Sequence, residues 1–165
     1  MSLAPLLVDV GSSLEEATGL VRYLLVFVFA AIPVIEILVV VPIAIGLGLD
    51  PVVTGVVAFA GNVLSVYALI ACYRRVAAWL RRRRGDRSEP SDRYARARRL
   101  WDRYGLPGLA VGGPVLAGVH VAALVALLAG SRSRLVAAWM TAGIFAWTIV
   151  LVAVSAYGVS VLGLA

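Results

Sequence analysis

The sequence predicts an all-helical integral membrane protein, and three observations carry that prediction. The chain of 165 residues is 62% hydrophobic and only 15% charged, and its mean hydropathy is +0.97. A soluble domain is usually about 45–50% apolar and roughly a quarter charged. Four long apolar segments follow one another, and a basic stretch separates the second from the third. A water-soluble fold would lack the polar surface needed to cover so much apolar area.

The second and fourth apolar segments, 51–73 and 135–157, match simple transmembrane helices. About 23 residues make about 34 Å of helix, which is close to the ~30 Å hydrocarbon core of a bilayer. Trp139 and Tyr157 lie near the two ends of the fourth segment, where aromatic side chains suit the membrane interfaces. We therefore expect one span in each segment.

The first and third segments, 23–49 and 104–130, are too long and too interrupted for one straight helix. Each would be about 40 Å long and would need a steep tilt. Interior proline removes a backbone donor and clashes with the preceding turn. The residues expected to break these helices are Pro33, Pro42, Gly112, Gly113, Pro114 and Gly118. We predict two re-entrant helical hairpins, each reaching the bilayer midplane and returning to its starting side.

Charge placement favours the same topology. Every basic residue is an arginine, and most of the 15 lie in the linker 74–103. The positive-inside rule places this linker in the cytoplasm. With re-entrant hairpins, Arg132 and Arg134 join it there, and only Arg22 opposes the bias; four spans would put Arg132 and Arg134 outside. A nucleic-acid-binding patch is disfavoured, because no such module is recognisable and apolar segments flank the linker.

The predicted order is an N-terminal segment (1–22), hairpin and span, basic linker, then hairpin and span, all in one membrane domain. The two hairpin–span units start from opposite sides of the membrane, which makes an inverted repeat with hairpin tips meeting near the midplane. Non-helical backbone at that depth must be buried in protein or line a wet cavity. We therefore expect a binding site where the hairpins meet, and two half-sites with so few spans suggest a homodimer.

An amphipathic helix is predicted within the linker, over 91–104. Pro90-Ser91 can start it, and one face then gathers Tyr94, Ala97, Trp101 and Tyr104. Such a basic helix lies flat on an anionic leaflet. The arginines expected to contact lipid headgroups or to fix the topology are Arg93, Arg96, Arg98, Arg99 and Arg103. The alternative is a solvated loop whose arginines act on topology alone.

Three polar side chains inside the apolar segments are candidate substrate- or proton-binding residues. Glu36 is the one acid away from a segment end, and an ionised carboxylate at the bilayer centre costs at least ~2.5 kcal/mol. It either faces a hydrated pathway or hydrogen-bonds the hairpin backbone as a neutral acid. His120, the single histidine, either relays protons or bonds a free carbonyl. Asn62, after Gly61, either contacts substrate or supports helix packing, with Gly61 allowing close approach.

No enzyme, metal or cofactor is predicted. One histidine and one carboxylate do not make a metal site, and Cys72 is the single cysteine. It lies at the end of an apolar run, which favours a buried thiol. No nucleophile elbow, zinc-binding pair or phosphate-binding loop motif is present.

Two motifs resemble those of the bacterial and archaeal small multidrug export proteins. The first runs from Glu36 through Pro42-Ile-Ala-Ile-Gly-Leu-Gly-Leu-Asp-Pro51 and is followed by Gly61-Asn62. The second is Arg-Tyr-Gly-Leu-Pro-Gly-Leu at 103–109, which leads into Gly113-Pro114 and Gly118. The resemblance covers most of 23–157 and includes the position of the basic linker. It implies a multi-pass protein of a prokaryotic plasma membrane.

That family is similar to the DedA/VTT membrane proteins, which implies two opposed re-entrant hairpins. Some DedA relatives are associated with proton-linked transport or with flipping of lipid-linked carriers such as undecaprenyl phosphate. Glu36 matches the acid that they carry in the first hairpin. They also carry arginines in the second hairpin, whereas 112–130 has none here and His120 is its one ionisable group.

The expected function is therefore membrane transport. We expect proton-coupled export of small amphipathic compounds or lipid-linked carriers through a midplane site, with the bilayer as the surrounding partner. One alternative is an uncoupled lipid scramblase or flippase of the DedA type. The other is a membrane scaffold that transports nothing and docks a cytosolic partner on its arginine linker.

Overall fold

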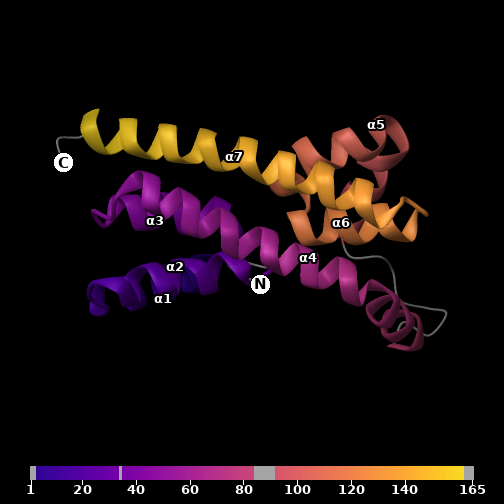
Figure 1. The fold of residues 1–165 in the computed structure, drawn as a ribbon, viewed down its shortest axis with the longest axis horizontal. Helices are drawn as coiled ribbons and strands as arrows, with labels where there is room; N and C mark the ends of the chain where they lie inside the picture. Colours follow the sequence, from indigo (N-terminus) through magenta and orange to yellow (C-terminus); the bar gives the residue numbers. More distant parts are fainter. Residues whose placement is uncertain (1–2, 34, 84–91, 162–165) are drawn as a thin grey trace. The chain divides into compact units, whose positions relative to one another are not determined.

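The protein is seen here as a computed structural model that describes residues 3–33, 35–83 and 92–161. Within these ranges it contains seven helices and no strand, so the predicted all-helical class is confirmed there (Figure 1). The helices are α1 (Leu3–Glu16), α2 (Leu20–Ala31), α3 (Glu36–Gly46), α4 (Pro51–Arg83), α5 (Asp92–Leu116), α6 (Val119–Leu128) and α7 (Ser133–Val161). They form two compact units: unit 1 takes the described residues of Met1–Leu64 and Phe145–Ala165, and unit 2 those of Ser65–Ile144.

A helical hairpin made by α2 and α3 is the centre of unit 1. The two helices pack against each other, and α1 packs against both (Figure 1). Ile32 ends α2 with an extended backbone, at φ −77° and ψ 124°. The residue before a proline is pushed out of the helical region, so Pro33 sets this end. Arg22 then secures α1, because its Nε donates a hydrogen bond of 2.8 Å to the carbonyl of Leu14 in the last turn of α1.

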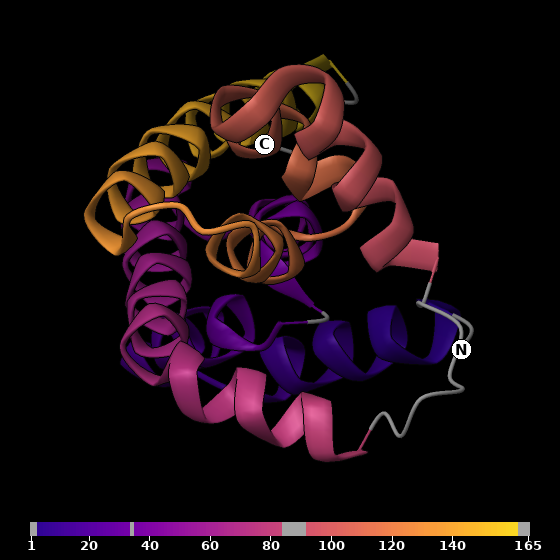
Figure 2. The same cartoon turned by 90° about the vertical axis from the view of Figure 1, so that its right-hand side faces the viewer.

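A second hairpin, in unit 2, is made by α5 and α6, which pack against each other. α5 is bent at Gly105, whose φ of 61° and ψ of −150° interrupt the helix (Figure 2). The turn to α6 falls at Gly118, which has a φ of 91°. The N–H groups of Ala117 and Gly118 both donate to the carbonyl of Gly113, at 2.9 and 2.8 Å, and close the end of α5.

Only some of the residues expected to break the helices lie at the hairpin turns. Pro33 and Gly118 lie at the turns, but Pro42 lies inside α3. Gly112, Gly113 and Pro114 lie inside α5. An interior proline costs one backbone bond, yet the helix continues where packing holds both flanks. Buried residues hold Pro42 in this way, and they are Val40, Val41, Ala44 and Ile45.

Two helices are long and apolar enough to cross a membrane, over Pro51–Tyr73 of α4 and Ser133–Val161 of α7. In each of them only 28% of the most apolar window is buried inside the protein. A core helix of a soluble protein would be mostly buried, so these helices present their apolar side chains outward. The two predicted spans are thus confirmed as candidate membrane spans.

Two segments contain helix that was not expected from the sequence. In the N-terminal segment this is α1, and in the linker it is the end of α4. α4 continues to Arg83, ten residues beyond the apolar stretch that ends at Tyr73, since arginine, alanine and leucine are good helix formers. The predicted linker helix is found from Asp92 onward, while its expected start at Pro90-Ser91 lies outside the described residues. The expectation of a buried Cys72 is wrong, because this thiol is exposed on α4.

The second arms of the two hairpins end in the same way. Gly48 follows α3 with a φ of 81°, and Gly130 follows α6 with a φ of 92°. At the end of α3, the N–H groups of residues 47–49 donate three hydrogen bonds to the carbonyls of residues 43–45. At the end of α6, the N–H groups of residues 129–131 donate the same pattern of bonds to the carbonyls of residues 125–127. This is the glycine-dependent closing turn common at helix ends.

The helix after each hairpin also crosses the first arm closely at a glycine. A side chain at Gly61 of α4 would overlap the carbonyl of Phe27 in α2. A side chain at Gly143 of α7 would overlap the carbonyl of Ala110 in α5. The same separation along the chain relates Gly61 to Gly143 and Gly48 to Gly130. The close approach at Gly61 was expected from the sequence, whereas the one at Gly143 was not.

Candidate functional site

Few polar side chains are buried in the described part of the chain. Glu36, Thr54, Asn62 and Thr148 belong to unit 1, and His120 belongs to unit 2. Three of these five were expected from the sequence as binding residues. Buried polar groups in an apolar chain are costly unless they are hydrogen-bonded or face a hydrated pathway, which makes them candidates for the site.

Glu36 has an unusual backbone. Its side chain is only 4% exposed, and its φ of +50° is the one positive value at a non-glycine residue in the described ranges. Left-handed backbone costs roughly 1–2 kcal/mol for a residue with a Cβ. Its N–H donates to the carbonyl of Ile32 at 3.2 Å, which ties it to the end of α2. A glycine would adopt the same backbone without this cost. A residue that keeps a side chain in a strained backbone is typical of functional sites.

The position of Glu36 also suits a negative charge. It is the first residue of α3, where unpaired backbone N–H groups and the positive end of the helix dipole favour an anion. The rest of the buried face of α3 is aliphatic, from Ile37 to Ile45. Glu36 therefore stands at the polar end of an otherwise apolar helix.

Asn62 is the second expected residue in unit 1, and it is fully buried on α4. Gly61 beside it brings α4 against the backbone of Phe27, so Asn62 lies at a tight crossing of α4 over the first hairpin. Thr54, two turns earlier on the same helix, is also fully buried. Glu36 and Asn62 thus belong to the same unit. The buried polar residues of unit 1 lie on α3, α4 and α7.

His120 belongs to unit 2 and has a definite partner. Its Nε2 lies 2.7 Å from the hydroxyl of Ser65 on α4, and the imidazole is only 6% exposed. Either group can donate in this hydrogen bond, depending on the tautomer. Ser65 was not expected from the sequence; the available signal was its position three residues after Asn62 in a span with few polar groups. That His120 and Glu36 share one site stays a prediction.

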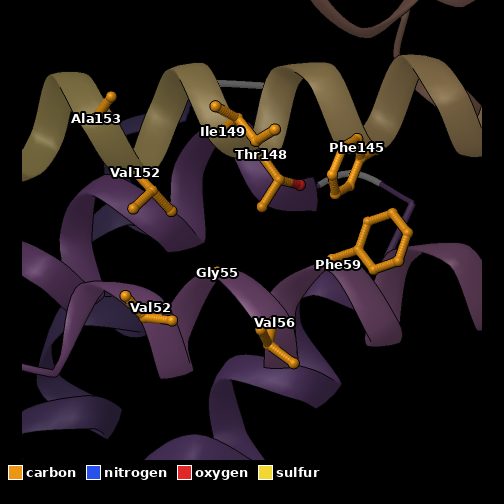
Figure 3. A pocket seen from close by; sticks show the side chains of 9 residues that line it. All are labelled: Val52, Gly55, Val56, Phe59, Phe145, Thr148, Ile149, Val152 and Ala153. Carbon is orange, nitrogen blue, oxygen red and sulfur yellow. The ribbon is translucent and has the colours of Figure 1, made fainter.

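An apolar groove of about 350 Å³ lies between α4 and α7 within unit 1 (Figure 3). Phe59 and Phe145 close one end with an edge-to-face contact, their ring centroids 5.8 Å apart. Thr148 supplies the one side-chain oxygen among the lining residues (Figure 3). The lining residues are Val52, Gly55, Val56, Phe59, Phe145, Thr148, Ile149, Val152 and Ala153. This groove could not be predicted from the sequence, because it depends on which faces of two helices distant in sequence meet.

The linker arginines divide into two groups on α5. Arg98 pairs with Asp102 at 3.2 Å on an exposed side of the helix. Arg96, Arg99 and Arg103 line a separate cavity of about 200 Å³. Arg93 lies in α5, and its side chain is outside the described part.

The geometry defines a helical protein with two helical hairpins, two candidate membrane spans and a small set of buried polar groups. The chain belongs to the family described as "Putative small multi-drug export protein", whose model matches residues 36–150. The match begins at Glu36 and includes Asn62 and His120. Its description names export, which is membrane transport and not an enzymatic activity. No curated protein and no solved structure matches the chain.

Metal ligation finds no support in the described ranges, where no three histidine, cysteine or acidic side chains gather in a group that could hold an ion.

Proposed function

We propose that this protein exports small amphipathic compounds or lipid-linked carriers across a prokaryotic plasma membrane, coupled to proton binding at Glu36. The observation that carries the proposal is the buried carboxyl of Glu36 on a strained backbone at the start of α3. Strained backbone is concentrated at functional sites, and a buried carboxyl in an apolar segment is typical of a substrate or proton pathway, so the two features together support this role.

Re-entrant hairpins are part of the proposal. α2, α3 and α6 have 12, 11 and 10 residues, which makes each about 15–18 Å long. Such helices, and the comparably short stretch of α5 that follows its interruption at Gly105, reach about halfway through a ~30 Å hydrocarbon core, so a turn between two of these arms would lie near the midplane. The matching closing turns at Gly48 and Gly130 support a repeat in which both halves descend from one hairpin–span unit.

In the mechanism that we propose, Glu36 alternates between a protonated and an ionised state. For a cationic amphipathic substrate, proton binding removes the attracting charge and lets the substrate leave, and loss of the proton restores an anion that attracts the next one. An anionic lipid-linked carrier would follow the reverse order and bind while Glu36 is protonated. Asn62 would supply a hydrogen-bonding amide to the same pathway. The pair of His120 and Ser65 would supply a second polar group, and the proposal does not require His120 to carry the proton.

The test is transport by purified protein in liposomes with an imposed pH gradient and a fluorescent cationic amphiphile as substrate. Glu36→Gln should abolish gradient-driven flux, because the amide cannot exchange a proton. Glu16→Gln, which changes an exposed acid in α1, is the matched control and should transport normally. Flux retained by Glu36→Gln would refute the role of Glu36, and absence of flux from the unaltered protein would favour the scaffold alternative.

An uncoupled lipid scramblase is the second candidate, and the apolar groove of unit 1 favours it. The groove opens between two candidate spans, and Val56 and Phe145 on its rim are 64% and 55% exposed, so an acyl chain could enter from the bilayer. Equilibration of a fluorescent lipid between leaflets, at the same rate with and without a pH gradient and in Glu36→Gln, would support scrambling in place of coupled export.

A further inference from the structure

We propose that Arg96, Arg99 and Arg103 form a binding site for the phosphate of an anionic phospholipid, with the acyl chains lying along the adjacent arm of α5. The site belongs to unit 2 and does not rest on the function proposed for Glu36. It separates three of the linker arginines from Arg98, which pairs with Asp102.

The three arginines share one face of α5. Their spacing of three and four residues places them on successive turns of a helix, and all three line the cavity of about 200 Å³. Every charged residue that lines this cavity is an arginine. Three guanidinium groups around one cavity repel one another, and an anion in the centre would remove that repulsion. The planar guanidinium fork matches the oxygens of a phosphate.

The walls of the cavity are apolar, and the bend at Gly105 builds them. Because α5 turns back there, Leu100 reaches Gly112 on the second stretch of the helix. A Cβ at Gly112 would lie 2.9 Å from Leu100 Cδ2, so this leucine packs directly on the glycine. Leu116 closes the cavity from the far end of α5, and Arg103 lies over the ring of Tyr104 at 5.3 Å from its centroid.

Exposed apolar side chains lie on the arm of α5 that reaches the cavity at Leu116, and they favour a lipid as the ligand. Val111, Val115 and Leu116 are 63%, 55% and 43% exposed on the same arm of α5. Arginines at one end and exposed aliphatic side chains at the other match a molecule with a phosphate headgroup and acyl chains. Free phosphate would use the arginines alone, so competition by inorganic phosphate distinguishes it from a lipid.

The experiment measures lipid retained by the purified full-length protein, by native mass spectrometry after detergent exchange. We expect phosphatidic acid or phosphatidylglycerol to bind at least about tenfold more tightly than phosphatidylcholine. Arg96→Gln, Arg99→Gln and Arg103→Gln combined should remove this preference, and Arg98→Gln, the matched control, should keep it. Glu36→Gln should also keep it, which separates this proposal from the transport mechanism.

Three results would overturn the proposal. Equal losses in Arg98→Gln and Arg99→Gln would show diffuse attraction in place of a site. Displacement of the lipid by inorganic phosphate at equal concentration would assign the affinity to phosphate alone. Unchanged binding of the anionic lipid to the Leu116→Asn variant would show that the apolar wall does not contribute to the site. Thermal unfolding of each variant in neutral detergent checks that folding is intact, so that a loss of lipid reports on the site.

Discussion

Glu36 and Gly118 stand at the start of the second arm of their hairpins, and both have a positive φ, which residues with a side chain avoid. Glu36 starts α3 with a φ of 50°, and Gly118 precedes α6 with a φ of 91°. The separation between them along the chain equals that between Gly48 and Gly130. One hairpin therefore uses the residue suited to this turn, and the other holds an acid there at a cost in strain.

Replacing Glu36 by glycine should separate stability from function. Glu36→Gly is expected to raise the free energy of unfolding by about 1 kcal/mol, because glycine adopts the left-handed backbone without strain. It should abolish gradient-driven transport, because the carboxyl is lost. Chemical unfolding in detergent micelles and flux in liposomes measure the two effects. A destabilised Glu36→Gly protein would indicate that the carboxyl has a structural role.

Alanine at the two crossing glycines should be strongly destabilising. A methyl group at Gly61 or Gly143 would overlap a backbone carbonyl, which cannot rotate away as a side chain can. We expect each substitution to cost about 3 kcal/mol, at the upper end of the usual overpacking range. Gly158→Ala is the control, since nothing lies near that position on α7, and it should be neutral or slightly stabilising. Thermal unfolding gives the comparison, and equal stability of all three variants would contradict the close crossings.

The hydrogen bond between His120 and Ser65 should appear as an energetic coupling. Ser65→Ala, His120→Ala and the double variant form a double-mutant cycle for the 2.7 Å contact. We expect a coupling of about 1 kcal/mol, typical of hydrogen bonds between membrane helices. The free energies of unfolding of the four proteins measure it. Simple additivity would mean that the contact contributes nothing to stability.

Re-entrant topology can be tested by labelling single cysteines from each side of the membrane in a Cys72→Ser background. Asp50→Cys should be labelled from outside with either topology, so it serves as the reference. Ser131→Cys should be labelled from the cytoplasm if residues 104–130 return to their starting side. Labelling of Ser131→Cys from outside would show that this segment spans the membrane.

Much of the local structure was predictable because it depends on neighbours in the chain. The turn at Pro33 follows from the restriction that a proline places on the residue before it, and Ile32 has the expected extended backbone. Pro42 shows the limit of this reasoning. Its effect depends on whether packing holds the flanks of α3, and that packing comes from residues elsewhere in the chain.

The candidate site was predictable in its residue types and not in its partners. Glu36, Asn62 and His120 were predicted as site residues because polar residues are rare in the apolar segments. A polar group in such a segment is costly wherever the segment packs. The partner of His120 could not be read from the chain, because Ser65 is distant in sequence and meets it only when α4 packs near α6. The division of the linker arginines had the same cause, since it depends on the bend at Gly105.

By itself, the sequence determined the helical class, the two candidate membrane spans, the interruption of the first and third apolar segments, and the arginine linker. Hydropathy, charge and backbone restriction are properties of adjacent residues, so they can be read without a fold. Only the tertiary structure decided the strained backbone of Glu36, the glycine crossings, the apolar groove and the three-arginine cavity. These features arise where helices distant in sequence come into contact, and such contacts depend on the packing of all the segments together.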